Sequence, residues 1–273
     1  MMRDNQLNAK YFEKIKQYCL MDDDFMSKCF EDNIECTQLV VNIVLNRKDL
    51  IIEKVHTQHK IKNLQGRSII LDIYATDNNG KKYNIEIQRS DKGAHAKRAR
   101  YHSSLLDANI TKPGDAYENL LETYVIFITE KDIFGYGKPI YHIKRKIQEV
   151  NEVFEDGTNI IYVNGEYRDD SPLGLLMKDF ACTNPEDIHY EQLATRVRYL
   201  KNSEKGVSTM GRVMDEFKKE IQEETIFNER RELAKGILKI GILSYEQIAK
   251  CFKLSLEEVQ ELAKEVQREQ VNG

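Results

Sequence analysis

Two acidic side chains stand inside strand-like, largely apolar segments of this 273-residue chain: Asp72 within residues 68–75, and Glu86 within 83–88. Carboxylates in such surroundings cost free energy unless they are exposed, paired or bound to a metal ion. Two carboxylates that face each other repel unless a cation lies between them. With no Cys or His cluster nearby, this residue set indicates a site for Mg²⁺ or Mn²⁺. The alternative is a solvated hairpin with two ordinary surface acids.

The loop between the two segments decides whether the acids meet. Its sequence, Asp-Asn-Asn-Gly, is a strong turn signal. A three-residue loop with Gly80 in the left-handed conformation places Asp72 directly opposite Glu86, on one face of the sheet. A two-residue loop places Asp72 opposite Ile87 and puts the acids on opposite faces. The sequence leaves both registers open, and only the first builds a site.

The patterns around these strands predict a mixed α/β domain. Apolar residues at helical spacing, with a break near Asp32, begin the pattern. Three strands, one helix, two strands and then helices to the end follow. The expected segments are helices over 22–45, 92–109 and from 172 onward, and strands over 51–61, 68–75, 83–88, 122–129 and 159–163. The stretch between the last two strands is expected to be irregular. We place the domain border between 1–205 and 206–273.

Composition limits the classes of protein. Hydrophobic residues make up 41% and charged residues 32%, which is enough for a folded core with a polar surface. The net charge of −4 excludes a globally basic nucleic-acid-binding protein but allows a local basic face. No apolar run approaches the roughly 18 residues of a membrane span. With no signal-peptide core in residues 1–20 and no paired cysteine spacing, we expect a cytoplasmic protein without a membrane partner.

Taken in order, the segments resemble the PD-(D/E)XK nuclease core, and most of all the Rpn family of recombination-promoting nucleases and transposases. Residues 69–72 (IILD) carry the aspartate, and residues 84–88 (NIEIQ) carry the Glu-x-Gln that this family has where other members have Glu-x-Lys. Residues 97–101 (KRARY) match its basic-aromatic helix, and 124–129 (YVIFIT) its central strand. The resemblance covers most of the chain.

The resemblance implies a restriction-endonuclease-like fold, in which helices flank a mixed central sheet, with a helical C-terminal extension. It also implies a metal-dependent DNA endonuclease associated with recombination or mobile elements. Asp72 and Glu86 would hold Mg²⁺ or Mn²⁺, with the Ile87 carbonyl as a further ligand. Glu35 matches the acid often supplied by the first core helix, although a solvated helix glutamate explains it as well. Gln88 can orient water or phosphate but carries no positive charge.

The same resemblance makes Arg98 and Arg100 candidates for DNA binding. Arg98 and Tyr101 are three residues apart and share a helix face; we expect Arg98 to face phosphate and Tyr101 to pack in the core. His56 and His59 are three apart on a strand, so we expect them on opposite faces and predict no zinc site.

The C-terminal residues contain two capping boxes, one from Ser244 to Gln247 and one from Ser255 to Glu258, around a turn at Lys253. This arrangement resembles a helix-turn-helix. The second helix is acidic, which disfavours contact with phosphates. We therefore expect these helices to pack or to join copies of the chain into a homo-oligomer. For the whole protein, the competing hypothesis is a catalytically weak or inactive nuclease fold that binds DNA or a protein partner.

Overall fold

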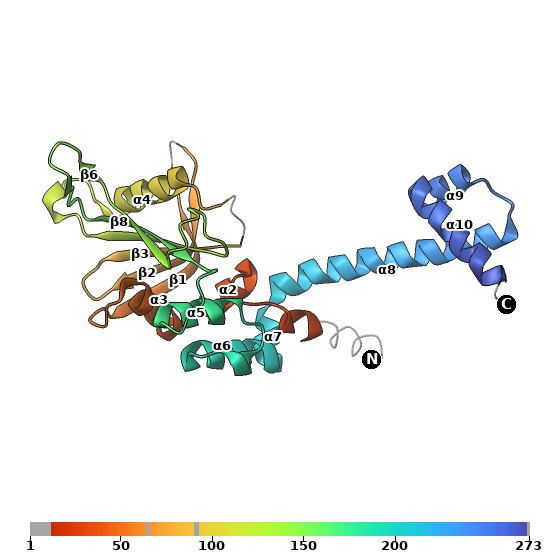
Figure 1. Cartoon of the computed structure of the whole chain (residues 1–273), viewed down its shortest axis with the longest axis horizontal. Coiled ribbons are helices and arrows are strands. Elements are labelled where there is room, and N and C mark those ends of the chain that lie inside the picture. Colours follow the sequence, from red (N-terminus) through yellow and green to blue (C-terminus); the bar gives the residue numbers. More distant parts are fainter. Residues whose placement is uncertain (1–11, 64–65, 90–92, 272–273) are drawn as a thin grey trace. The chain divides into compact units, whose positions relative to one another are not determined.

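The computed structural model describes residues 12–63, 66–89 and 93–271, with side chains placed up to 210 and again over 226–266 (Figure 1). The chain divides into two compact units, residues 1–211 and 212–273. Among the helices of the described residues, none is both long and apolar enough to span a membrane.

Within the described residues, the first unit is built on a six-stranded sheet. Across the sheet the strands are β1 (Ile52–Ile61), β2 (Ile69–Asp77), β3 (Lys82–Gln88), β4 (Thr123–Thr129), β8 (Thr158–Asn164) and β5 (Ile140–Ile143). Strands β1 to β3 form an antiparallel meander, β4 and β8 continue parallel to β3, and β5 closes the edge antiparallel to β8. The predicted mixed sheet is confirmed.

Helices cover both faces of this sheet (Figure 1). Helix α4 (Ala96–Ile110) packs on one face, where Ala99 belongs to a buried cluster with Val125 and Phe127. On the other face, α2 (Asp23–Phe30) and α3 (Ile34–Leu45) contact the sheet. Helices α5 (Pro172–Ala181) and α6 (Glu191–Asn202) pack against these two, and α7 (Glu204–Thr209) follows against α6. The predicted break between the first two helices is confirmed, because Asp32 has a φ of 51° and the Asn33 side chain caps α3.

The segment between β4 and β8 is more regular than predicted. It contains β5 and a small hairpin of β6 (Lys146–Ile147) and β7 (Glu152–Val153). The expectation of an irregular stretch is wrong here because strands of two to four residues are too short to show an alternating pattern.

The β2–β3 hairpin takes the register that a three-residue loop gives. Thr76 pairs with Lys82 and Ile73 with Ile85, and Gly80 has a φ of 81°. The two-residue alternative is excluded. Asp72 precedes Ile73 and Glu86 follows Ile85, so continuing this register by one residue places Asp72 opposite Glu86.

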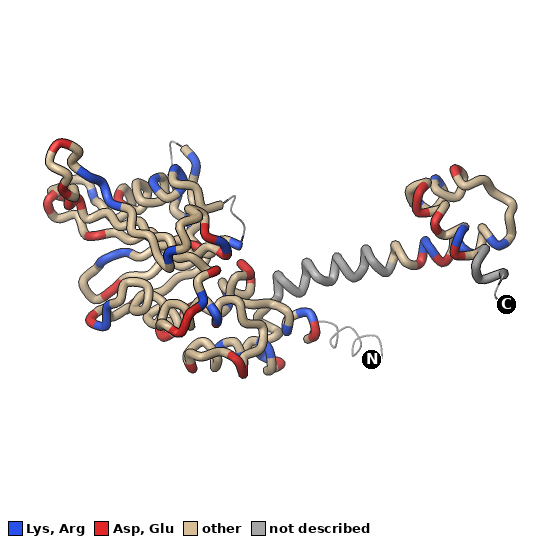
Figure 2. The backbone as a smooth tube through the Cα atoms, in the orientation of Figure 1, with Lys and Arg blue, Asp and Glu red and all other residues tan. Residues whose placement is uncertain are grey.

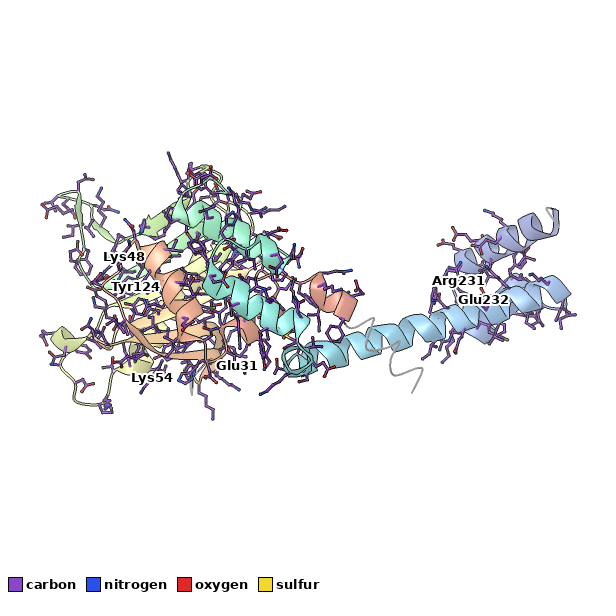
Figure 3. The ribbon with its side chains drawn as sticks, turned by 90° about the horizontal axis from the view of Figure 1, so that it is seen from below. Glu31, Lys48, Lys54, Tyr124, Arg231 and Glu232 are labelled. Carbon is purple, nitrogen blue, oxygen red and sulfur yellow. The ribbon has the colours of Figure 1, made fainter. Side chains whose placement is uncertain are left out.

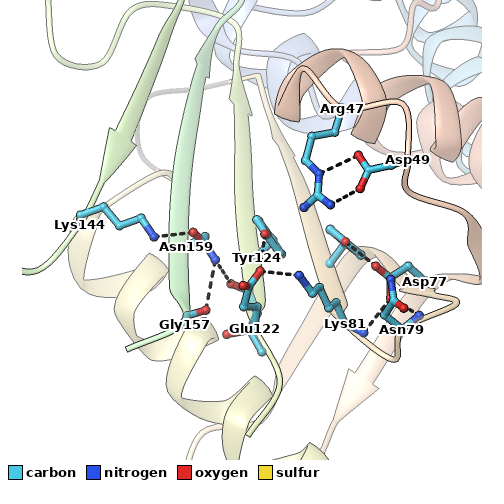
Figure 4. A network of polar contacts seen from close by, with 12 residues as sticks. Arg47, Asp49, Asp77, Asn79, Lys81, Glu122, Tyr124, Lys144, Gly157 and Asn159 are labelled. Carbon is cyan, nitrogen blue, oxygen red and sulfur yellow. Dashed lines mark hydrogen bonds and ion pairs between the residues drawn. The ribbon is translucent and has the colours of Figure 1, made fainter. Parts of the chain in front are cut away.

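Asp77 fixes this turn (Figure 4). Its buried carboxylate accepts hydrogen bonds from the backbone N–H groups of Asn79 and Lys81, each at 2.9 Å, and from the Tyr83 hydroxyl at 2.9 Å. The Lys81 ammonium also lies 2.8 Å from a Glu122 carboxylate oxygen, which ties the loop to the start of β4. These contacts set the register on which the acid pair depends.

Replacing Asp77 with Ala is expected to lower the free energy of unfolding by about 2 kcal/mol, because the buried Tyr83 hydroxyl and two turn amides lose their acceptor. Urea unfolding followed by circular dichroism measures this. Asn78→Ala, which changes an exposed neighbour in the same turn, should stay within about 0.5 kcal/mol of the wild type. Equal stability of the two variants would show that Asp77 does not hold the turn.

The second unit consists of most of α8 (Gly211–Ile240), α9 (Tyr245–Phe252) and α10 (Leu256–Val271). Its core cluster is formed by Ala234, Ile248, Leu254, Val259 and Leu262. Both predicted capping boxes are present, and Lys253 adopts a φ of 52° between α9 and α10. Arg231, labelled in Figure 3, extends from α8 and lies 3.4 Å from Glu265 of α10.

Candidate active site

The backbone pairing of β2 with β3 ends at Ile73 and Ile85. Beyond this pair, the side chains of Asp72 and Glu86 contact the backbone of the opposite strand. The Asp72 carboxylate accepts a hydrogen bond from the Ile87 N–H at 3.0 Å. The Asp72 N–H lies 3.4 Å from the Glu86 carboxylate. Each acid thus reaches across to the backbone of the opposite strand, so the strands separate where the two carboxylates stand.

Burial and mutual repulsion perturb Asp72. Removal from water, followed by the charge of Glu86, raises its pKa from 3.8 to about 8. The Ile87 N–H and the Arg98 guanidinium lower the pKa in part, whereas the charge of Asp23 raises it further. Without a cation, Asp72 therefore holds a proton at neutral pH. A divalent cation between the acids would favour the ionised form instead.

Glu86 is fully buried and paired with a cation from the helix above it. The Arg98 Nη2 lies 2.7 Å from Glu86 Oε2. The Arg98 Nη1 donates to the side-chain oxygen of Gln88 at 3.3 Å and to the Gly93 carbonyl at 3.1 Å. The first turn of α4 thereby places a positive charge beside the Glu-x-Gln segment, where Gln88 itself supplies none.

His102 and Asn84 extend this group, and sequence reasoning did not select either of them. His102 Nε2 accepts from Arg98 Nε at 3.3 Å, and its Nδ1 lies 3.2 Å from Asn84 Nδ2 and 3.5 Å from Glu86 Oε1. Both side chains are buried. The sequence spacing indicates both residues. Arg98 and His102 are four residues apart and share a helix face, and Asn84 and Glu86 are two apart and share a strand face.

Gly93 is a further residue that sequence reasoning missed. A Cβ atom at this position would stand 1.6 Å from the Gln88 side-chain oxygen and 3.1 Å from Arg98 Nη1. Only a residue without a side chain leaves the Gln88 carboxamide in contact with Arg98.

Gly93→Ala is therefore expected to push the Gln88 carboxamide off Arg98 with little change in folding stability, because a flexible side chain can move aside. For the DNA endonuclease that the resemblance implies, loss of one hydrogen bond to a charged group predicts that cleavage slows by about 10-fold. Initial rates of plasmid nicking measure this, with Gly236→Ala as the control, since a methyl group there meets no neighbouring atom. A Gly93→Ala variant that nicks at the wild-type rate would contradict the role of Gly93.

Glu35 stands apart from this group. It lies exposed on the first turn of α3, in a hollow that it shares with Glu191 and Arg196 of α6. No hydrogen bond or ion pair among the described side chains joins it to Asp72 or Glu86, and the described residues contain no group of three or more acid, His or Cys side chains placed to hold a metal. The acid of the helical layer that acts on Asp72 is instead Asp23 of α2.

A groove of about 1150 Å³ is lined in part by Arg98 and His102, the two side chains of α4 that contact Glu86. The groove lies between residues 67–70 and the first turns of α4. Its described lining contains no acidic side chain and four basic ones, which are Arg67, Lys97, Arg98 and Arg100. Figure 2 shows basic residues along α4. Arg98 and Arg100, both predicted to bind DNA, thus line one groove. Tyr101 is partly buried on the cluster of Ile61 and Ile69, and its hydroxyl donates to the Arg67 carbonyl at 2.5 Å.

The two histidines of β1 do not face opposite sides as predicted. The rings of His56 and His59 stack with centroids 6.0 Å apart, and His59 stacks on Tyr74 at 4.7 Å. The physical reason is Gln58, whose φ of 52° breaks the two-residue alternation of the strand.

The sequence of residues 29–167, about half of the chain, matches the family described as PD-(D/E)XK nuclease family transposase. The matched region includes β1 to β8, α4 and the acid pair. Searches of curated proteins and of solved structures return no match.

Proposed function

The chain belongs to the PD-(D/E)XK nuclease family of transposases, and on this premise we propose that it is a metal-dependent DNA endonuclease that acts in recombination or on mobile elements. The observation that carries the proposal is the acid pair. Asp72 and Glu86 meet where two strands separate, beside an arginine that also contacts Gln88. That arginine also lines a basic groove suited to a phosphate backbone.

The donor set fits Mg²⁺ or Mn²⁺. Carboxylate oxygens are the ligands that these ions prefer. The raised pKa of Asp72 reflects burial first and then repulsion by Glu86, and a divalent cation would relieve the repulsion. Asp72 and Glu86 would hold the ion, which when bound polarises the scissile phosphate and lowers the pKa of a water molecule. Glu35 remains only a sequence prediction as a third ligand.

The remaining side chains have separate tasks. Gln88 orients a water molecule or a phosphate oxygen through its carboxamide. Arg98 supplies the positive charge that stabilises developing negative charge on the phosphate, which glutamine cannot do. Arg67, Lys97 and Arg100 hold the DNA backbone along the groove.

Supercoiled plasmid DNA provides the test. The purified full-length protein should nick or linearise it with Mg²⁺ or Mn²⁺ and should stop when EDTA is added. Asp72→Ala should remove this activity, whereas Glu53→Ala, which changes an exposed acid on β1, should retain it. Cleavage by the Asp72→Ala protein at the wild-type rate would rule out the site.

A second candidate function has its own support. Glu86 is fully buried and already paired with Arg98, and Gln88 stands where other PD-(D/E)XK members have lysine. A protein of this kind would bind DNA or a protein partner without cutting. Calorimetric titration with Mn²⁺ separates the two, because the endonuclease requires heat of binding that Glu86→Gln abolishes.

The location and assembly of the protein are also proposals. We expect it in the cytoplasm, and we expect copies to associate through the C-terminal helices. In support, Ile226, Leu233 and Ile240 of α8 recur every seven residues and are 46%, 60% and 63% exposed. Light scattering of the wild type and of Leu233→Glu tests the association.

A further inference from the structure

The position of Arg98 depends on a side chain that has no assigned role. Its guanidinium makes four polar contacts, with Glu86, Gln88, the Gly93 carbonyl and His102. The first three leave the Nε–H group unused, and only His102 accepts from it among the described residues, at 3.3 Å. A planar guanidinium has a fixed set of N–H directions, so the bond at Nε sets where its two terminal nitrogens point.

This contact determines the protonation of His102. The Arg98 Nε–H can only donate, so His102 Nε2 must present a lone pair. In a neutral imidazole the proton then resides on Nδ1. If Nε2 carried a proton instead, two hydrogen-bond donors would face each other 3.3 Å apart and no hydrogen bond could form.

The Nδ1–H group of His102 in turn shows which atom of the Asn84 carboxamide, oxygen or nitrogen, faces it. As placed, the Asn84 Nδ2 lies 3.2 Å from His102 Nδ1, so two donors would meet. The Asn84 side-chain oxygen, meanwhile, is buried and has no hydrogen-bond partner among the described residues. Exchanging the oxygen and nitrogen of this carboxamide gives the Nδ1–H an acceptor, with Glu86 Oε1 at 3.5 Å as a second one.

We propose that His102, whose Nε2 accepts the Arg98 Nε–H and whose Nδ1 faces the Asn84 carboxamide, is a positioning residue that holds Arg98 against Glu86 and Gln88. The chain of contacts runs from β3 through α4 and back to β3. Its catalytic consequence rests on the proposed nuclease function, because Arg98 acts on a phosphate only if the site cuts DNA. The arrangement of the three side chains does not depend on that function.

Burial supports this assignment. His102 is 3% exposed and Glu86 is fully buried, whereas the Arg98 side chain is 34% exposed toward the groove. Water therefore has little access to the His102 side of this bond. The Phe127 ring lies 5.9 Å from the Arg98 guanidinium and 6.2 Å, between centroids, from the His102 ring. An apolar wall thus flanks both side chains, which leaves His102 as the acceptor for Arg98 Nε.

Long-range ¹H–¹⁵N spectra of the metal-free, full-length protein test the arrangement directly. His102 should show a pyrrole-like Nδ1 and a pyridine-like Nε2, and its signals are assigned by their loss in His102→Gln. The Arg98 Nε–H signal should be protected from exchange in the wild type and in His102→Gln, whose side-chain oxygen can accept the same bond. It should lose protection in His102→Leu. His142→Gln, an exposed change on β5, is the matched control and should leave the Arg98 signal unchanged.

Cleavage assays test the consequence. His102→Gln should keep the turnover number close to the wild-type value, whereas His102→Leu should lose about 10–100-fold in kcat with a smaller change in KM. A wild type that cuts no DNA would refute the proposed function, while the spectra would still decide the role of His102. A proton on Nε2, or an Arg98 signal in His102→Leu as protected as in the wild type, would overturn the inference. If His102→Leu does not fold, the role of His102 is decided by its tautomer in the wild type and by the Arg98 Nε–H protection in His102→Gln.

Discussion

Replacing Asp72 with Asn is expected to abolish DNA cleavage and, at the same time, to stabilise the metal-free protein. Asparagine keeps the oxygen that accepts the Ile87 N–H and carries no charge at any pH, so folding no longer requires this side chain to take up a proton beside Glu86. Loss of one of the two carboxylates proposed to hold the cation should remove several kcal/mol of transition-state stabilisation, so activity should fall by about 1000-fold or more. A residue that costs stability and is required for activity is typical of a functional site.

The stability effect has a definite pH dependence. The pKa of Asp72 rises from 3.8 to about 8 on folding, so between these values the folded protein holds a proton that the unfolded chain has released. The free energy of unfolding contributed by Asp72 therefore falls as pH rises, by up to about 1.4 kcal/mol per pH unit, and levels off above pH 8. Asp72→Asn should lack this slope.

Urea unfolding in EDTA from about pH 5 to 8 measures the effect. Bound Mg²⁺ should reduce the wild-type slope, because a cation favours the ionised carboxylate. Glu53→Ala serves as the control, since it removes an exposed acid on β1. Identical pH profiles for the wild type and Asp72→Asn would contradict the perturbation of Asp72.

Arg98→Ala is expected to have the second large effect, on both stability and activity. It leaves the fully buried Glu86 without its cation, which predicts a loss of about 3 kcal/mol in the free energy of unfolding. Cleavage should fall as well, because the charge beside Gln88 disappears. Combining Arg98→Ala with Glu86→Gln should recover part of the stability, since no uncompensated charge remains, but none of the activity.

Chemical denaturation of the single and double variants tests this. Arg100→Ala, an exposed change on the same helix, should leave the free energy of unfolding within about 0.5 kcal/mol of the wild type. If Arg98→Ala matches Arg100→Ala in stability, the ion pair with Glu86 does not contribute to the fold.

The sequence predicts local features of this protein well. The alternating strand patterns locate Asp72 and Glu86, and the turn signal limits their pairing to two registers. Choosing between the registers required the structure, because the deciding contacts of Asp77 with Lys81 and Tyr83 form only in the folded hairpin.

Features that depend on packing were not predictable. Nothing in the sequence sets how α4 lies over β3, and this alone brings His102 and Arg98 to Glu86. The same holds for the first helical layer, where Glu35 matches the family pattern but Asp23 is the acid whose charge reaches Asp72. Acids on two consecutive helices cannot be ranked until the helices are packed on the sheet.

The proposed function requires that Asp72 and Glu86 share one divalent cation. A crystal structure of the full-length protein soaked in Mn²⁺, with anomalous diffraction, tests it most directly. We expect an anomalous peak at about 2.0–2.3 Å from one carboxylate oxygen of each residue, with the Arg98 guanidinium still beside Gln88. A Mn²⁺-saturated crystal with no peak at the pair, or with the peak bound to only one of the two carboxylates, would contradict it.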